Sequence, residues 1–199
     1  MINILILANE VQDEVDKLIA RTFDDPHYKY YHVNGYLDYK SDNTSNWPKE
    51  EYVSIDSNGK IVGHFYARID RNARSVTSLA AINLDRDNRG PLFALDFKRF
   101  IEKMLIERGY YKMRFCVITE NPAMHMYDKF IERYDGRVVG TFMKDDRLPD
   151  GKLYDTKHYE IFSEDFIKAK NRKEAMNDDS NSTSELVSGI GRHEHPSPI

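Results

Sequence analysis

The chain has 199 residues, of which 40% are hydrophobic, and a formal net charge of -4 from 29 basic and 33 acidic side chains. That length can bury one sizeable core, so we expect one globular domain rather than two. Acidic and basic residues are interspersed along the sequence, which leaves no overall positive field to attract nucleic acid or an anionic lipid surface. Neither nucleic acid nor a membrane is therefore indicated as a partner.

The sequence contains a single cysteine, Cys116. One cysteine excludes an internal disulfide framework and a cysteine-based zinc site within one chain, and it fits a reducing, cytoplasmic location. Because Cys116 lies inside an apolar run, we expect a small core residue rather than a nucleophile.

The apolar opening INILILA lacks the basic leader and the cleavage site of a signal peptide, and it is too short to span a bilayer. It therefore predicts a buried strand.

The first half of the chain predicts a strand, a helix and three further strands. Residues 2–8 form the predicted first strand, and the apolar spacing over 11–22 predicts an amphipathic helix. Residues 24–50 mix aromatic side chains with Asp, Asn, Pro and Gly, and we expect loops and short turns there. Two β-rich runs, 52–56 and 61–70, surround Asn58-Gly59, which is a strong hairpin signal; a further strand is predicted over 75–84.

The second half predicts two helices, a strand between them and a closing hairpin. Apolar residues at spacings of three and four predict a helix over 90–108 that ends at Gly109. A strand over 112–118 follows, and then a helix over 121–134 with Asn121 as N-cap and Pro122 at its first position. The runs 137–145 and 153–162 flank the turn RLPDGK. This order implies an α/β fold with a mixed sheet and helices on its faces.

From residue 163 onward the sequence becomes charged and Ser-rich. We therefore expect a folded domain over residues 1–162 and a largely disordered tail over residues 163–199. The tail contains the sequence HEH at 193–195, but two histidines in such a segment do not define a metal site, and we expect no metal.

Two motifs stand at matching places in this order of elements. The stretch RGPLFA, residues 89–94, follows the predicted fourth strand, and Asn121 is followed six residues later by Tyr127 after the fifth strand. With these motifs, residues 1–162 resemble the GNAT superfamily of acyl-CoA-dependent N-acyltransferases. The resemblance implies a mixed, mostly antiparallel central sheet of about seven strands flanked by helices, and acetyl-CoA as the co-substrate.

The family's pyrophosphate loop has the pattern Arg/Gln-x-x-Gly-x-Gly/Ala, and here Leu92 occupies the first glycine position. A helix N-terminus presents free N–H groups and a partial positive charge, which suits a pyrophosphate. A leucine forced into the left-handed conformation costs about 1–2 kcal/mol, whereas a helical Leu92 keeps its amide available. The stretch by itself fits a capped helix start without a ligand equally well. The expected coenzyme-binding residues are Arg89, Gly90, Leu92, Phe93, Ala94 and Leu95.

The resemblance also assigns roles around the thioester. Asn121 would hold the pantetheine arm, Tyr127 would protonate the departing thiolate, and backbone N–H groups at Ile82 and its neighbours would polarise the thioester carbonyl. A phenol with a pKa of about 10 is a suitable acid for a thiolate. Each assignment has a structural alternative, because Asn is a favoured N-cap and a helical Tyr often packs in a core.

A base is also needed, because a lysine-like amine has a pKa of about 10.4 and is protonated at pH 7. No family motif fixes that base here. Glu120 and Asp85, at the ends of adjacent predicted strands, are the carboxylates expected closest to the reaction centre, and we select Glu120 as the catalytic candidate. His125 and His158 are alternatives if their side chains point inward.

In this family the acceptor is usually selected by the segment after the first helix and by the last hairpin. Here that segment is rich in tyrosine and aspartate, and we take Tyr28, Tyr31 and Asp38 as candidate substrate-binding residues. Aromatic faces with carboxylates suit a cation, although the alternative that these rings pack the loops is slightly favoured. The predicted acceptor is a primary amine, on a small molecule or on a protein.

Three functions remain open at this point. The first is transfer of an acetyl group from acetyl-CoA to a primary amine by direct attack, with Tyr127 as the acid. The second is a catalytically inactive binding protein with the same fold, and the third is acylation of an amine on modified nucleic acid. The residues leave the oligomeric state open, with a homodimer among the options.

Overall fold

A computed structural model describes residues 3–23, 25–31, 49–85 and 91–188, and it describes only the backbone of Tyr31 and of residues 176–188. The strands are β1 (Ile4–Leu7), β2 (Lys49–Ile55), β3 (Ile61–Asp70), β4 (Ser75–Asn83), β5 (Lys112–Ile118), β6 (Arg137–Arg147) and β7 (Leu153–Phe162). The helices are α1 (Gln12–Phe23), α2 (Pro91–Glu102), α3 (Met124–Arg133) and α4 (Ser163–Ser188). Shorter helical turns are η1 (Ala8–Val11), η2 (Pro26–Tyr31) and the π-turn η3 (Lys103–Glu107).

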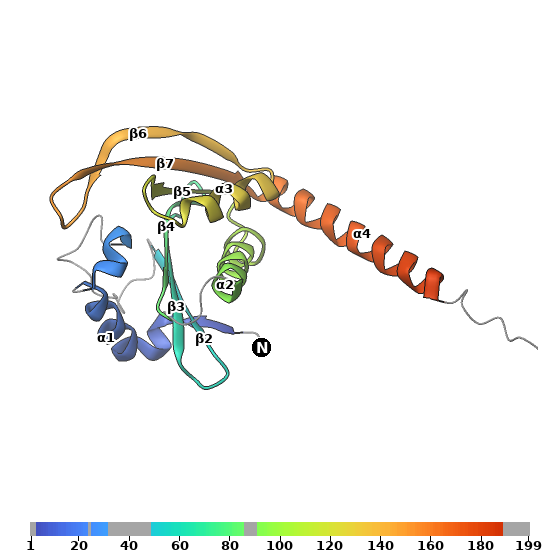
Figure 1. Cartoon of the computed structure of the whole chain (residues 1–199), viewed down its shortest axis with the longest axis horizontal. Coiled ribbons are helices and arrows are strands. Elements are labelled where there is room, and N and C mark those ends of the chain that lie inside the picture. Colours follow the sequence, from blue (N-terminus) through green and yellow to red (C-terminus); the bar gives the residue numbers. More distant parts are fainter. Residues whose placement is uncertain (1–2, 24, 32–48, 86–90, 189–199) are drawn as a thin grey trace, which may run out of the picture.

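The described residues form one seven-stranded sheet in the order β1-β2-β3-β4-β5-β7-β6. Neighbouring strands in it run antiparallel, except that β4 and β5 run parallel. The sheet is strongly twisted, so that β6 and β7 cross above β2, β3 and β4 in Figure 1. The predicted α/β class and the mostly antiparallel sheet are confirmed.

Helices cover both faces of the sheet (Figure 1). The larger core lies on the face covered by α2, η3 and α3, where Phe97 and Phe100 pack against Phe65 and Phe115. A smaller core lies on the opposite face, where residues of η1, α1 and η2 pack against β2, β3 and β4. Side chains alternate between the two faces along each strand, which explains why a strand contributes to both cores.

Local turn chemistry fixes two of the predicted boundaries. Asp56 accepts hydrogen bonds from the backbone of Asn58 and Lys60 at 2.8 and 2.9 Å, and Gly59 has φ +81°. Gly109 has φ +69° and follows η3. Positive φ is the conformation that glycine adopts at little cost, so the predicted hairpin and helix end are both confirmed.

Two element starts differ from the predictions. Strand β2 begins at Lys49 rather than at residue 52, because Glu50 is paired with Tyr110 and Glu51 is paired with Lys49 of the same strand. Helix α3 begins at Met124 rather than at Pro122. The Asn121 side chain accepts a hydrogen bond from the Ala123 amide at 2.9 Å, which makes a turn just before the helix instead of its N-cap.

The segment after residue 162 differs from the disordered tail that composition suggests, because residues 163–188 form helix α4. Phe166 and Ala169 are buried in the larger core, and the Phe166 ring stacks on Tyr134 with centroids 4.6 Å apart. Tertiary contacts, which local composition does not report, therefore order the start of this segment. Beyond its first turns α4 extends away from the sheet (Figure 1). No helix among the described residues is long and apolar enough to cross a membrane.

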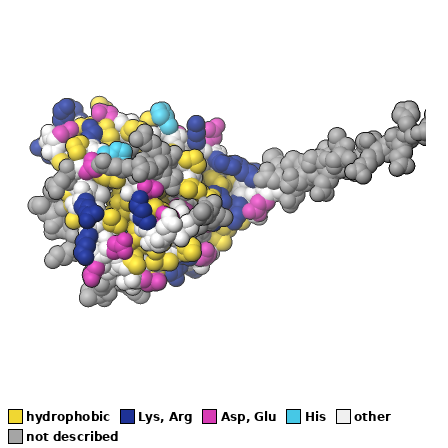
Figure 2. All heavy atoms as spheres, turned by 60° about the horizontal axis from the view of Figure 1, so that its bottom comes forward, with side chains coloured by type: hydrophobic (Ala, Val, Ile, Leu, Met, Phe, Trp, Pro, Cys, Tyr) yellow, Lys and Arg dark blue, Asp and Glu magenta, His cyan; other side chains and the backbone are white. Residues whose placement is uncertain are grey.

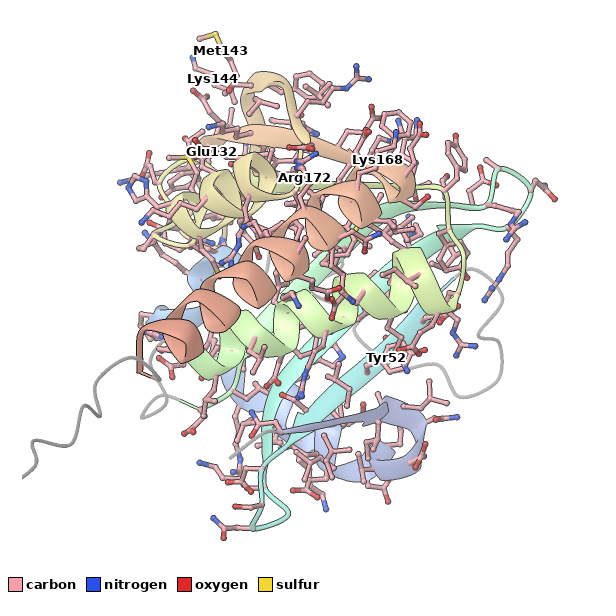
Figure 3. All side chains as sticks on the ribbon, turned by 90° about the vertical axis from the view of Figure 1, so that its right-hand side faces the viewer. Tyr52, Glu132, Met143, Lys144, Lys168 and Arg172 are labelled. Carbon is pink, nitrogen blue, oxygen red and sulfur yellow. The ribbon has the colours of Figure 1, made fainter. Side chains whose placement is uncertain are left out.

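Strand β6 forms one edge of the sheet. Met143, near the middle of this strand, is 78% exposed. Met143 and Lys144 lie at the outer edge of the molecule in Figure 3, away from α2 and α4. The register between β6 and β7 shifts near both residues, and Lys144 has φ +52°. Such irregularities interrupt the ladder and discourage uncontrolled pairing at an edge.

Candidate active site

The candidate site is the place where β4 and β5 separate. In the described part of the chain these strands pair only at Ser75 with Lys112 and at Val76 with Met113. Beyond those pairs β4 stays with β3 up to Asn83, and β5 stays with β7 up to Ile118. The two strands therefore diverge toward their C-terminal ends, and backbone groups of both strands line the gap between them.

A bulge in β4 explains the divergence. Arg68 pairs with Ser78 and Ile69 pairs with Val76, so Thr77 is an extra residue in β4. The Thr77 hydroxyl donates a hydrogen bond to the Arg68 carbonyl at 3.3 Å. A bulge bends the strand that carries it, and this one follows directly after the last pair between β4 and β5.

The register shows which amides of β4 face the gap. The Leu84 amide donates to the Val62 carbonyl of β3 at 3.0 Å. In an antiparallel strand the backbone groups of successive residues point to opposite sides, so Ile82, like Leu84, directs its amide to β3. The amides of Ala81 and Asn83 point to the gap instead. Of the predicted group of Ile82 and its neighbours, the neighbours are thus the ones whose amides point to the gap, and the side chain of Ile82 belongs to the smaller core.

Helix α2 begins at Pro91, shortly after β4 ends. Leu92 is therefore helical, and it is not among the described non-glycine residues with positive φ. Among the first-turn residues of α2, Leu92 and Phe93 have amides that the helical hydrogen-bond pattern leaves unused, whereas that pattern already uses the amides of Ala94 and Leu95. Ala94 and Leu95 are accordingly poorer candidates than Leu92 and Phe93. The predicted residues Arg89 and Gly90 lie outside the described residues.

Helix α3 carries the candidate acid on the face of the sheet that α2 also covers. Tyr127 is 7% exposed, and its ring centroid lies 5.3 Å from that of Phe97 and 5.4 Å from that of Phe115. The packing alternative for Tyr127 is therefore realised, and a chemical role would have to coexist with it. Asn121 is half-buried, and its side-chain oxygen is used by Ala123 while its NH2 group keeps both hydrogens for a ligand.

The described turn η2, at the start of the predicted acceptor segment, lies over the opposite face of the sheet. The Tyr30 ring of η2 packs edge-on against Tyr154 of β7, with centroids 6.5 Å apart, and both contact a small cluster with Ile118. Glu120 is exposed just after β5. The hydrogen bond that Tyr154 donates to Asp150 is the largest cause that raises the pKa of the Tyr154 phenol, and the nearby Glu120 carboxylate raises it further. Glu120 therefore lies between the end of β5 and the acceptor segment.

Tyr28 also belongs to this segment. It is 5% exposed in the smaller core together with Ile82, and burial followed by the nearby Asp85 carboxylate raises its pKa. Asp85 is ion-paired with Lys60 at 3.1 Å, which makes it a weaker candidate base than Glu120. Of the other predicted substrate residues, the side chain of Tyr31 and the whole of Asp38 lie outside the described residues.

The two candidate histidines lie on different sides of the sheet. His125 is exposed on α3. His158 of β7 lies opposite Cys116 of β5, and it contacts Thr156 and Asp145. Cys116 is exposed rather than part of the core, which corrects the expectation for it. Strand alternation in the sequence YDTKHYE predicts that Tyr154, Thr156 and His158 share a face. The contacts of Thr156 and His158 with Asp145 depend instead on pairing with β6.

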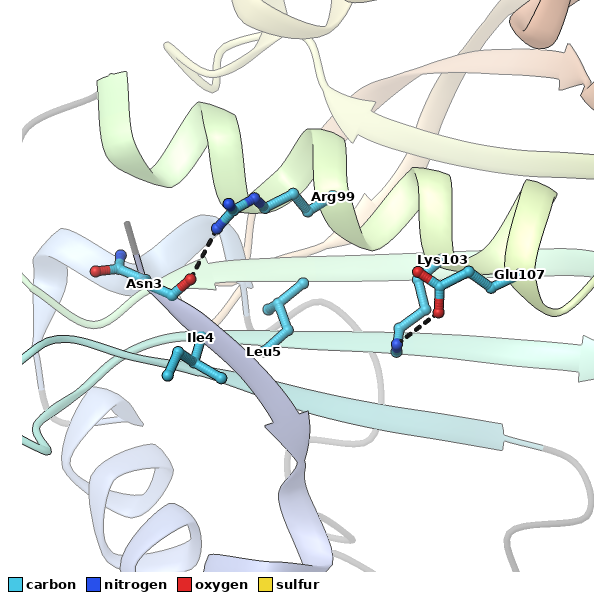
Figure 4. Close-up of a pocket in the computed structure, with 6 residues that line it drawn as sticks. All are labelled: Asn3, Ile4, Leu5, Arg99, Lys103 and Glu107. Atoms are coloured by element: carbon cyan, nitrogen blue, oxygen red, sulfur yellow. Dashed lines mark hydrogen bonds and ion pairs between the residues drawn. The ribbon is translucent and has the colours of Figure 1, made fainter. Parts of the chain in front are cut away.

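A separate hollow of about 380 Å³ lies between β1 and α2 (Figure 4). Arg99 donates to the Asn3 carbonyl at 2.7 Å, and Lys103 pairs with Glu107 at 2.8 Å. Both cations of this hollow are thus used within the protein. The hollow lies at the β1 edge of the sheet, and β2 and β3 separate that edge from the β4–β5 gap.

In the residues that the structure describes, no group of three His, Cys, Asp or Glu is placed to hold a metal ion.

Comparison of the sequence with protein-family models and with curated proteins gave no match. Solved structures do match the fold. A spermidine/spermine N-acetyltransferase SpeG from Vibrio cholerae, in complex with manganese ions, matches with a TM-score of 0.53 and 18% identity over 78% of this chain and 77% of that chain. A spermidine N-acetyltransferase from Vibrio cholerae in complex with CoA and spermine gives the same TM-score, identity and coverage.

A chimera of Vibrio cholerae SpeG and hSSAT matches with a TM-score of 0.55 and 16% identity over 78% of each chain. At these identities the likeness concerns the fold. The separated β4 and β5, the bulge of β4 against β3 and the two flanking helices thus stand in a sheet of a known kind. The chain has the fold of the GNAT N-acetyltransferases.

Proposed function

We propose that this protein transfers an acetyl group from acetyl-CoA to a primary amine. The observation that carries the proposal is the gap between β4 and β5, with the N-terminus of α2 at its open end. Backbone groups along the gap suit the amide-rich pantetheine arm, and the helix N-terminus suits the pyrophosphate. Among the solved structures with this fold is an acetyltransferase that holds CoA and spermine, which supports the choice of co-substrate.

In this proposal the backbone of β4 stabilises the transition state. The amides of Ala81 and Asn83 would donate to the thioester oxygen as it gains negative charge, because both point into the gap. Preorganised backbone donors of this kind are worth about 3–4 kcal/mol each when they lie at the right distance from an oxyanion. The Asn121 NH2 group and the first-turn amides of α2 would hold the rest of the coenzyme.

Tyr127 is the proposed acid for the departing thiolate. It lies on the α2 and α3 face, where the coenzyme would enter between those helices, and it packs against Phe115 at the edge of the gap.

The proposed acceptor is a cationic amine, because Tyr30 and Tyr154 present rings on the opposite face near the exposed Glu120. Lys29 already lies over the Tyr30 ring at 4.7 Å, so these rings do accept a cation.

The test combines binding with turnover. Acetyl-CoA at millimolar concentration should raise the melting temperature, and release of free thiol should require an amine from a panel of spermidine, spermine, a lysine peptide and an aminoglycoside. The absence of both effects would overturn the proposal. A thermal shift without turnover on any amine would instead favour a binding protein.

Acylation of an amine on nucleic acid has no specific observation in its favour. On the face in Figure 2, Lys and Arg side chains are interspersed with Asp and Glu rather than gathered in one field. Salt-dependent binding to nucleic acid depends on a basic surface, so the amine panel rather than nucleic acid is the first assay.

A further inference from the structure

His158 belongs to a hydrogen-bonded group on the face of the sheet where the acceptor segment lies. The Thr156 hydroxyl donates to Asp145 Oδ2 at 2.5 Å and contacts His158 Nε2 at 2.9 Å. His158 Nε2 lies 3.4 Å from the same carboxylate oxygen. The Phe142 ring covers the imidazole, with centroids 4.2 Å apart. One ring face and one ring nitrogen of His158 are thus fixed by its neighbours.

These contacts select one tautomer of the neutral imidazole. A threonine hydroxyl has a single hydrogen, and here that hydrogen goes to Asp145. The Thr156 oxygen can then only accept from His158, so Nε2 carries the ring hydrogen and Nδ1 carries the lone pair. Within the described part of the chain, Nδ1 has no hydrogen-bond partner. The His158 side chain is 28% exposed, so a ligand can reach it.

The position of His158 relative to Tyr127 follows from strand alternation. Phe115 of β5 and Tyr159 of β7 face α3 and contact Tyr127. Cys116 and His158 are the next residues along these strands, so their side chains point to the opposite face. Ile118 and Tyr154, which contact Tyr30 of η2, share that face. His158 therefore lies on the acceptor side, one strand away from the β4–β5 gap.

We propose that His158 is the base that deprotonates the acceptor amine, with Thr156 and Asp145 as positioning residues. This inference rests on the proposed acetyltransferase function. It places the two proton transfers on opposite faces of the sheet. The base His158 takes a proton from the amine on the face of η2, and the acid Tyr127 gives a proton to the thiolate on the face of α3. The gap between β4 and β5 lets the thioester carbon be reached from the base side while its sulfur is reached from the acid side.

The ammonium group gives one proton to His158 Nδ1, and the amine lone pair forms the C–N bond to the thioester carbon. The C–S bond then breaks, and its electron pair leaves on sulfur, which takes the proton of Tyr127. The nitrogen loses its second proton to water on the base side, the Tyr127 phenolate takes a proton from water on the acid side, and the imidazolium releases its proton to water. Asp145 stabilises the imidazolium while it exists, because the carboxylate lies next to Nε2.

Other charged and titratable groups near His158 share its electrostatic field. Desolvation of the Cys116 thiol, followed by the Asp146 and Asp145 carboxylates, raises the pKa of that thiol to about 11, so it is neutral near pH 7 and does not compete as a base. Glu160, two residues along β7, is already paired with Lys112 and Arg137. Arg114 of β5, opposite Glu160, is a cation on this face, and Lys29 lies over the Tyr30 and Tyr154 rings.

The first experiment compares His158→Gln with His125→Gln in the full chain, using acetyl-CoA and the best amine of the panel. We expect His158→Gln to lower kcat by about a hundredfold or more, as expected for loss of a general base, with the acetyl-CoA thermal shift unchanged. His125→Gln is the matched control on the other face and should stay within about twofold of wild type. Equal activity of the two variants would overturn the inference.

The pH dependence distinguishes a base from a structural residue. Without the base, only the neutral amine reacts, so the deficit of His158→Gln should shrink about tenfold per pH unit toward the amine pKa, about 10.4 for a lysine-like acceptor. Added imidazole should restore part of the activity of His158→Ala and should leave Tyr127→Phe unchanged. A deficit that is independent of pH and not rescued by imidazole would assign His158 to structure only.

Thr156→Val provides the second variant, should the substitutions at His158 prevent folding. Valine keeps the shape of threonine but removes the hydroxyl that selects the tautomer, so kcat should fall about tenfold with KM for acetyl-CoA unchanged. Full activity of a folded Thr156→Val protein would overturn the inference. If instead wild type shows no acetyl-CoA binding and no transfer to any amine, the acetyltransferase proposal itself fails, which is a different result.

Discussion

The ring of Phe93 in α2 stacks on the ring of Phe65 in β3, with centroids 5.5 Å apart and planes inclined by 17°. Phe65 is fully buried, so this contact fixes the first turn of α2 against the sheet. Leu92 precedes Phe93 by about 100° of helix rotation and is only half-buried. The position of the first turn of α2 therefore does not depend on the Leu92 side chain. The backbone at Leu92 is already helical.

This arrangement predicts the effect of shortening Leu92. Because the backbone at Leu92 does not require glycine, Leu92→Ala should strengthen acetyl-CoA binding a few-fold, corresponding to less than about 1.4 kcal/mol. Leu92→Gly should do no better, since glycine adds only flexibility in a helix. Isothermal titration of both variants checks this prediction. Weaker binding by Leu92→Ala would mean that the side chain contacts the coenzyme or that the loop is not its site.

Tyr127→Phe tests the proposed acid without disturbing the core. Phenylalanine retains the ring that packs between Phe97 and Phe115, so the melting temperature and its increase with acetyl-CoA should persist. Loss of a general acid should lower kcat by about a hundredfold or more. Thiol release at the wild-type rate would remove Tyr127 from the mechanism and leave it a packing residue.

The order of the elements could be predicted from the sequence because its signals are local. Alternation over 61–70 and 75–84, the Asn58-Gly59 turn and the apolar spacing before Gly109 each act within a few residues. The start of α4 could not be predicted in this way. Its order comes from Phe166 against Tyr134, two residues whose contact depends on the packing of α4 across α3.

The same distinction applies to the candidate site. The two motifs place the first turn of α2 and Tyr127 near the gap because they follow the strands directly. The direction of the Ile82 amide and the contact of Asp145 with His158 depend instead on strand register, and both registers include a bulge. A shift of one residue reverses which groups face the gap, and the amino-acid pattern does not report such a shift.

A buried polar cluster around Glu50 predicts a large effect on stability. Glu50 is 6% exposed and accepts hydrogen bonds from Tyr52 at 3.0 Å and Tyr110 at 2.7 Å. Arg108 pairs with the same carboxylate at 3.0 Å. Burial, followed by the contact with Glu50, raises the pKa of Tyr110 to about 12, so both phenols stay protonated as donors.

Glu50→Ala removes the common acceptor of these groups and should lower the free energy of unfolding by about 3 kcal/mol. Glu107→Ala is the control, because Glu107 pairs with Lys103 at an exposed position and its loss should cost less than about 1 kcal/mol. Urea unfolding of both variants measures the difference. Equal losses would mean that the cluster around Glu50 contributes no more than a surface ion pair.

Finally, His64 predicts how stability depends on pH. It is 2% exposed in β3, and burial lowers its pKa from 6.5 to about 4. Below pH 6.5 the unfolded chain binds a proton that the folded protein does not, so stability falls as the pH falls, until the folded state also binds it near pH 4. Between pH 7 and pH 5 the free energy of unfolding should fall by about 2 kcal/mol, measured as a lower urea midpoint with an unchanged m value.

Carboxylates with lowered pKa values, such as those of Glu160 and Asp128, lose their contribution to stability only below their ordinary pKa values near 4. The pH dependence above pH 5 therefore reports His64. His64→Gln should flatten this dependence, and a variant that retains the full slope would assign it to other groups.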